Sequence, residues 1–320
     1  MKRLTIGKLR GLQQCASSRG TFTCLALDHR QNLRRSLNPE NPNAVPDLAL
    51  TDFKLEVAET LANEASAVLF DPEYSAAQAV AGGILPKDAG LVVAVEATGY
   101  TGDPTARQSR ILPGWSMAKA KRMGASMVKL LVYYHPDSPT ASEIENFVIQ
   151  VAEEGKKYDL GIMLEPLSYS LDGGKLSSAE KRKVVIETAH RLTPLGADLL
   201  KAEFPLSTRE ASQNSWSEAC AEISSASTLP WILLSAAVDF ETYLHQIEIA
   251  CNAGASGAAV GRAVWKEAVA MKPDERREFL NGEARERLSR LTALSTALGK
   301  PWTDFFTAGE MKDWYKNYAG

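Results

Sequence analysis

Two lysines of this sequence lie inside strongly apolar segments. Lys129 lies in MVKLLVYY and Lys201 lies in DLLKAEFP. A lysine in a buried strand directs its ammonium into the interior or to the rim, and desolvation and neighbouring cations lower the pKa of such a group. The resulting amine can attack a carbonyl and form a Schiff base. Lys201 is therefore a candidate nucleophile, and the alternative is a buried ion pair with Glu165 or Glu203.

Carboxylates in other apolar runs could move protons beside these lysines. Glu165 lies in GIMLEPL, and if alternate residues of that strand face inward it stands between the two lysines. There it can shuttle protons during carbinolamine formation and dehydration, or act only as a counter-ion. Asp28 closes the run TCLALDHR, and Arg30 follows it, where it can bind an anion at the rim. His29 alternates away from Asp28, which predicts a place behind the site or in the loop.

Polar residues also end the other runs. Asp71 and Glu96 end the second and third runs, where either could serve only to hold a lysine or a loop backbone. Ser235 ends the seventh run, and Gly261 and Arg262 end the eighth, before a predicted helix. Backbone N–H groups at a helix start, an arginine and a serine hydroxyl together predict a phosphate site, rather than a turn glycine with a surface arginine.

Metal and nucleotide chemistry lack the required motifs. The chain has four histidines with no H-x-H or H-x-x-x-H pair, the spacing typical of a metal site. It has no P-loop and no G-x-S-x-G motif, and no G-x-G-x-x-G motif follows the first apolar run. We therefore expect amine chemistry without a metal or a cofactor.

Eight strand-length apolar runs must position these residues. Each is apolar on both faces, as parallel strands covered by helices are, and helix-forming stretches such as 141–158 and 177–192 separate them. The polar residues at their ends lie 25 to 43 positions apart, about one strand–helix unit. This count predicts a closed (β/α)8 barrel of the α/β class rather than an open sheet. The runs begin at Thr23, Ala65, Gly90, Ser126, Gly161, Asp198, Pro230 and Ser256.

The barrel accounts for most of the chain. We expect an amphipathic N-terminal helix in residues 1–20, the barrel in 21–298 and an aromatic-rich tail in 299–320. The tail should pack on its own barrel or on a neighbouring subunit, so a homo-oligomer is possible. Residues 31–47 are rich in Asn and Pro, which predicts an irregular loop.

Composition limits the environment and the partners. The chain has 320 residues, 36 basic against 39 acidic, and a net charge of −3, which gives no overall field for a nucleic acid. No apolar run approaches the roughly 20 residues of a membrane span, and no signal-peptide pattern is present. Four scattered cysteines suit buried thiols in a reducing compartment, so we expect a cytoplasmic protein.

Six motifs resemble those of one enzyme family. ALDHR, LEPLSY, LLKAEFP and GRAVW, with DPEY and EATGY, are similar in sequence and order to the class I tagatose 1,6-bisphosphate aldolases and the related sulfofructose 1-phosphate aldolases. The similarity runs from about Thr21 to Trp265. It implies a (β/α)8 enzyme that cleaves a ketose phosphate to dihydroxyacetone phosphate and an aldehyde without a metal.

The resemblance also implies roles for individual residues. Lys201 matches the Schiff-base lysine, Glu165 the proton-transferring glutamate, and Asp28 and Lys129 the charged residues beside them.

Substrate-binding groups are implied in the same way. Arg30 matches a substrate-binding arginine, and Ser235 and Arg262 match groups around the phosphate of the dihydroxyacetone end. His29 replaces a usual glutamine, and Ala237 replaces a usual glycine.

The resemblance leaves the substrate open. DPEY and the Thr-Gly-Tyr segment favour the tagatose branch, whereas LTDFK and PWILLS favour the sulfosugar branch. A protein that binds a sugar phosphate without turning it over is the alternative from another class.

Overall fold

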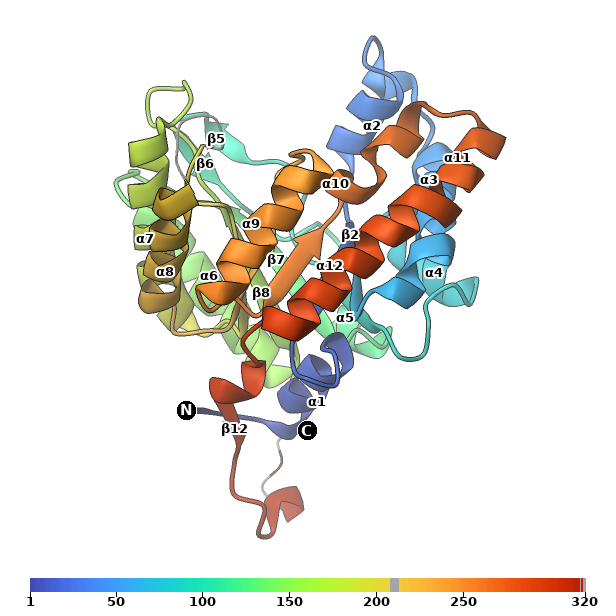
Figure 1. Ribbon diagram of the computed structural model, residues 1–320. Helices are drawn as coiled ribbons and strands as arrows, with labels where there is room; N and C mark the ends of the chain where they lie inside the picture. Colours follow the sequence, from blue (N-terminus) through green and yellow to red (C-terminus); the bar gives the residue numbers. More distant parts are fainter. Residues whose placement is uncertain (208–212, 317, 319–320) are drawn as a thin grey trace.

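A computed structural model describes residues 1–207, 213–316 and 318 of the chain. Eight parallel strands close into a barrel in the order β10–β11–β2–β3–β4–β7–β8–β9, and helices surround it (Figure 1). The predicted (β/α)8 fold is confirmed, and each apolar run forms one strand. The barrel strands are β2 (Phe22–Leu27), β3 (Ala67–Phe70), β4 (Gly90–Ala94), β7 (Met127–Tyr133), β8 (Gly161–Leu167), β9 (Leu199–Ala202), β10 (Trp231–Leu234) and β11 (Gly257–Val260).

Helices cover the outer faces of these strands. Every residue of β2, β3, β4, β9, β10 and β11 is buried, which explains why their sequences are largely apolar rather than alternating. The helices are α1 (Ile6–Cys15), α2 (Gln31–Leu37), α3 (Asp47–Leu61), α4 (Ala76–Ala81), α5 (Met117–Arg122), α6 (Ala141–Lys157), α7 (Ser178–Leu192), α8 (Gln213–Ala226), α9 (Phe240–Asn252), α10 (Arg262–Trp265), α11 (Pro273–Phe279) and α12 (Arg285–Leu298).

The predicted helices α6 and α7 are confirmed, and α7 begins with a serine cap. The Ser177 side chain accepts from the Glu180 N–H, and the Glu180 side chain accepts from the Ser177 N–H. A π-helical turn (Leu280–Ala284) joins α11 to α12.

The expectation of an irregular loop over residues 31–47 was wrong in its first half, because α2 occupies Gln31–Leu37. The prolines of this segment all follow α2, so the seven helical residues contain no helix breaker. Leu33 is buried, and the buried Arg34 guanidinium binds the Val45 carbonyl and the Asp47 carboxylate. These contacts hold α2 at the carboxyl end of the barrel.

The opposite end of the barrel carries both termini. Helix α1 packs there, where Lys8 forms a buried 2.8 Å ion pair with Asp198. Strand β1 (Lys2–Leu4) pairs in parallel with β12 (Phe306–Ala308), and a hairpin of β5 (Thr101–Asp103) and β6 (Ala106–Gln108) lies apart from this pair.

The aromatic tail divides into two parts. Trp302 and Phe306 are buried, whereas Trp314, Tyr315 and Tyr318 are exposed. The first part therefore packs on its own chain, as expected.

All four cysteines are buried and form no disulfide, as the sequence predicted. No helix in the described ranges is long and apolar enough to cross a membrane.

Candidate functional site

A cavity of about 580 Å³ opens at the carboxyl ends of the barrel strands. Parallel strands in a closed barrel all end on this face, so residues far apart in sequence meet there. All eight residues singled out from the sequence line the cavity: Asp28, Arg30, Lys129, Glu165, Lys201, Ser235, Gly261 and Arg262.

Glu165 lies between the two buried lysines. Lys129 is on β7, Glu165 on β8 and Lys201 on β9, and these strands are neighbours in the barrel. Glu165 Oε1 is 2.9 Å from Lys201 Nζ, and Glu165 Oε2 is 3.3 Å from Lys129 Nζ. The predicted position of Glu165 is confirmed. Glu203 makes a different contact, because its Oε2 accepts a 2.6 Å hydrogen bond from the Ser168 N–H.

Lys129 is surrounded by three carboxylates. Besides Glu165, its Nζ lies 2.7 Å from Asp28 Oδ2 and 2.6 Å from Glu96 Oε1. Burial alone would lower the pKa of Lys129, but the carboxylates raise it above its ordinary value. Burial likewise opposes ionisation of Asp28, but the Lys129 charge lowers the Asp28 pKa below its ordinary value.

The three carboxylates therefore favour the charged form of Lys129. Lys201 has one carboxylate partner among the described residues, which is Glu165. The geometry favours Lys201 over Lys129 as the source of a free amine.

Glu96 is more central than its strand-end position suggested. Its carboxylate accepts from Lys129, from the Leu131 N–H at 3.1 Å and from Arg30 at 3.4 Å. Burial raises its pKa above the ordinary value. Glu96 therefore holds a lysine, one of the two predicted alternatives, and the backbone N–H that it binds belongs to strand β7 rather than to a loop.

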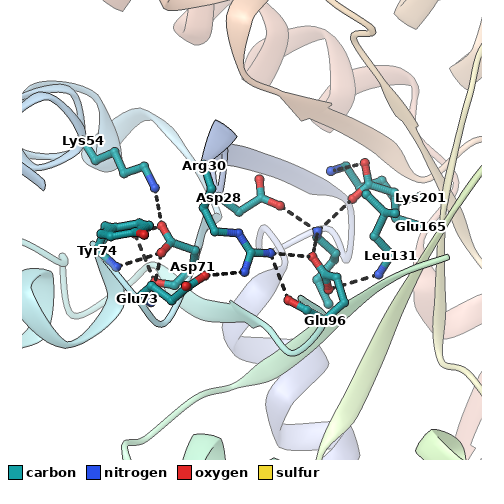
Figure 2. A network of polar contacts seen from close by, with 12 residues as sticks. Asp28, Arg30, Lys54, Asp71, Glu73, Tyr74, Glu96, Leu131, Glu165 and Lys201 are labelled. Carbon is teal, nitrogen blue, oxygen red and sulfur yellow. Dashed lines mark hydrogen bonds and ion pairs between the residues drawn. The ribbon is translucent and has the colours of Figure 1, made fainter. Parts of the chain in front are cut away.

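Asp71, directly after the end of β3, likewise holds a lysine, and it also holds a loop backbone. It contacts the buried Lys54 ammonium and accepts from the N–H groups of Glu73 at 3.0 Å and Tyr74 at 2.8 Å. Figure 2 shows this group beside the cavity cluster, with Arg30 between the two.

Arg30 links the strand ends. Its Nη1 donates to Glu73 at 2.7 Å, and its Nη2 donates to the Glu96 carbonyl at 3.0 Å (Figure 2). The side chain is buried and its charge is balanced by two carboxylates. Arg30 therefore fixes the β2–α2 connection against the end of β4.

The last two barrel strands form the other wall. Ser235, Ala236, Gly261 and Arg262 line it, and Arg262 begins α10. Burial lowers the pKa of Arg262, and this residue forms no ion pair with a described residue. An arginine without a carboxylate partner can bind an anion in the cavity.

His29 lies at the cavity, not behind it. Its ring lines the cavity and packs edge-on against Trp265 at 5.2 Å between centroids. Strand β2 ends at Leu27, so His29 is a loop residue, one of its two predicted places, and strand alternation does not apply to it. Burial, with the Arg262 and Lys201 charges, lowers the His29 pKa to about 3, so the ring is neutral.

The sequence reasoning missed several residues of the mouth. Tyr133, four residues after Lys129 on β7, also lines the cavity. The missed lining residues come from α2 and from the connection after β4: Gln31, Asn32, Arg35, Ala97, Thr98, Gly99 and Tyr100. Helical spacing within residues 31–37 was the signal for the first three.

Comparison with known families identifies this arrangement. A model described as DeoC/LacD family aldolase matches residues 22–267, which contain all eight barrel strands and the eight residues predicted for the site. The chain belongs to the DeoC/LacD family of aldolases.

Curated relatives of this aldolase match over nearly its whole length. A protein of Lactococcus lactis subsp. lactis named tagatose 1,6-diphosphate aldolase is 31% identical, with 94% of this chain and 99% of that protein covered. A protein of the same name from Listeria monocytogenes is 29% identical, with 94% of this chain and 95% of that protein covered.

Solved structures share the fold of this aldolase. An archaeal fructose 1,6-bisphosphate aldolase aligns with a TM-score of 0.62 at 20% identity, covering 91% of this chain and 99% of that one. The aldolase of Plasmodium falciparum gives a TM-score of 0.71 at 13% identity, covering 93% and 98%.

Proposed function

We propose that this aldolase is a class I, Schiff-base enzyme that reversibly cleaves tagatose 1,6-bisphosphate to dihydroxyacetone phosphate and glyceraldehyde 3-phosphate. The observation that carries the proposal is the Lys201 amine, 2.9 Å from Glu165 in a cavity that also contains Arg262, which has no ion-pair partner among the described residues. The names of the curated relatives support the choice of sugar.

Schiff-base formation uses the Lys201–Glu165 pair. Glu165 takes a proton from Lys201, and the free amine attacks the C2 carbonyl carbon of the ketose. Glu165 then donates a proton to the carbinolamine oxygen, which leaves as water, and a C2 iminium forms.

Cleavage follows from the iminium. The C4 hydroxyl loses its proton to a base, C4 becomes a carbonyl, and the C3–C4 electron pair moves to form an enamine as the iminium nitrogen accepts the C2 π pair. The aldehyde leaves, the enamine takes a proton at C3, and water hydrolyses the new iminium. This releases dihydroxyacetone phosphate and regenerates Lys201.

The remaining site residues bind and orient the sugar. Lys129 supplies a fixed positive charge for the substrate hydroxyls, and Asp28 accepts from them and holds Lys129 in place. At the other wall, Ser235, the Gly261 backbone and Arg262 bind the C1 phosphate.

Borohydride trapping tests the chemistry. Incubation with dihydroxyacetone phosphate and borohydride should leave a reduced adduct that peptide mass mapping places on Lys201. The Lys201→Met variant should give no adduct, and the Glu203→Gln variant should give one. An adduct on Lys129, or activity lost on chelation of divalent metals, overturns the proposal.

Substrate comparison tests the choice of sugar. We expect the highest kcat/KM for tagatose 1,6-bisphosphate among that sugar, fructose 1,6-bisphosphate and 6-deoxy-6-sulfofructose 1-phosphate. A clear preference for the sulfosugar would assign the enzyme to the other branch. Binding without cleavage of any of the three would indicate a sugar-phosphate-binding protein.

These phosphorylated substrates and the four free thiols support a cytoplasmic location.

A further inference from the structure

The cavity contains more positive charge than its carboxylates neutralise locally. Its described cations are Arg30, Arg35, Lys129, Lys201 and Arg262. Arg30, Lys129 and Lys201 are paired with carboxylates, as described above. Neither Arg35 nor Arg262 forms an ion pair with a described residue. A sugar with an anionic group at each end would match these two free guanidinium groups.

Arg35 belongs to a polar face of α2 directed at the cavity. Gln31 and Asn32 lie four and three residues before it, so all three share one side of the helix, and all three line the cavity. Leu33 and Arg34 are buried and anchor α2. Arg35 Nη1 donates to Asn32 Oδ1 at 2.9 Å, which restrains an otherwise exposed side chain.

Among the described residues, the other side of the mouth offers no equivalent unpaired cation. Glu165 lines it from β8 and Glu203 from just after the end of β9, and their negative charge disfavours a phosphate there. Arg107 on β6 is nearby, but it lies outside the cavity lining and stacks over the rings of Tyr100 at 4.4 Å and Tyr169 at 4.6 Å.

We infer that Arg35, supported by Gln31 and Asn32, binds the distal anionic group of the substrate, a phosphate or sulfonate at C6. Arg262 then holds the phosphate at C1. Arg35 belongs to α2 and Arg262 to α10, two separate helices near the same end of the barrel (Figure 1), and both residues line the one cavity. This inference rests on the proposed function, because it assigns the second anion of that substrate.

The test compares substrates with and without the distal anion. Initial rates are measured for the wild type, Arg35→Gln and Arg35→Lys with tagatose 1,6-bisphosphate and with tagatose 1-phosphate. Arg35→Gln should lower kcat/KM for the bisphosphate about tenfold or more, mainly through KM, since it removes a charged hydrogen bond. It should leave the 1-phosphate within about twofold, and Arg35→Lys should recover part of the loss.

Arg122→Gln is the matched control, because Arg122 is an exposed arginine on α5, away from the cavity. It should change neither substrate. Equal losses for both substrates with Arg35→Gln, or no loss for the bisphosphate, would overturn the assignment of Arg35.

Two further measurements separate the possible outcomes. Trapping of dihydroxyacetone phosphate on Lys201 should be unchanged in Arg35→Gln, since that product lacks the distal group. Wild-type protein that traps nothing and cleaves neither sugar overturns the proposed function and this inference with it. The same comparison with 6-deoxy-6-sulfofructose 1-phosphate distinguishes a distal phosphate from a distal sulfonate. Arg35 binds the anion of whichever substrate loses kcat/KM when Arg35 is replaced.

Discussion

Lys201 Nζ lies 2.9 Å from Glu165 Oε1, and the register of two neighbouring strands sets this contact. Leu164 on β8 pairs with Leu200 on β9, so the residues that follow them lie side by side and both face the cavity. Because barrel strands rather than loops carry both groups, a proton can pass between them without a conformational change.

Replacing Glu165 by Gln should remove proton transfer while keeping the shape of the site. We expect kcat to fall by roughly 10²- to 10⁴-fold, the usual contribution of a positioned general acid–base group. The rate of borohydride trapping should fall as well, because carbinolamine formation and dehydration use the same carboxylate. Steady-state and trapping rates measure both effects.

Glu203→Gln is the control for Glu165→Gln, because Glu203 lines the same cavity but binds the Ser168 N–H. It should retain most of the kcat. If Glu165→Gln also keeps kcat within about threefold, Glu165 is only a counter-ion.

Replacing Lys129 by Met should destabilise the fold itself. The variant would leave the buried carboxylates of Asp28, Glu96 and Glu165 without their shared cation. Breaking such a buried cluster costs roughly 3–5 kcal/mol, which urea denaturation can measure. The double variant with Glu96→Gln should recover part of this loss, whereas additive losses would show that the two groups are not coupled.

The sequence predicted the barrel well because its main signal is local. Buried parallel strands are apolar on both faces, and polar residues such as Glu165 and Lys201 interrupt them only near their carboxyl ends. The closed topology then brings those ends together, so residues found separately along the chain line one cavity.

The sequence could not predict the pairing of charges within the cavity. Which carboxylate faces Lys129 depends on strand register and side-chain reach, which a single sequence does not contain. Arg30 likewise looked like a free anion-binding group until its contacts with Glu73 and Glu96 were visible. His29 is a loop residue, one of the two predicted places, but strand alternation stops at the end of β2 and could not show that His29 lines the cavity.

His29 should make folding sensitive to acid. The pKa of His29 is lowered from 6.5 to about 3 in the folded protein, mainly by burial. As the pH falls, the imidazole therefore takes up its proton at a higher pH in the unfolded chain than in the folded protein. Stability should therefore fall as pH drops through this interval, by about 2 kcal/mol between pH 6.5 and 4.5 from this group. Urea denaturation of the wild type and His29→Gln across this range should show the variant gaining that amount relative to the wild type. A constant difference between the two proteins would contradict a neutral buried His29.

A glycine in the turn after β10 should lower the backbone strain of that turn. Ala236 and Ala237 have φ of +44° and +62°, and the Val238 N–H donates to the Ser235 carbonyl at 3.1 Å. Positive φ at both central residues favours glycine, and alanine there costs about 1–2 kcal/mol, partly offset by the greater freedom of glycine in the unfolded chain. Ala237→Gly should therefore raise the free energy of unfolding by roughly 0.5–1 kcal/mol. Ala253→Gly, at φ −86°, is the control and should lower it by a similar amount. A loss of stability in Ala237→Gly would show that the surrounding residues, not the turn, determine this conformation.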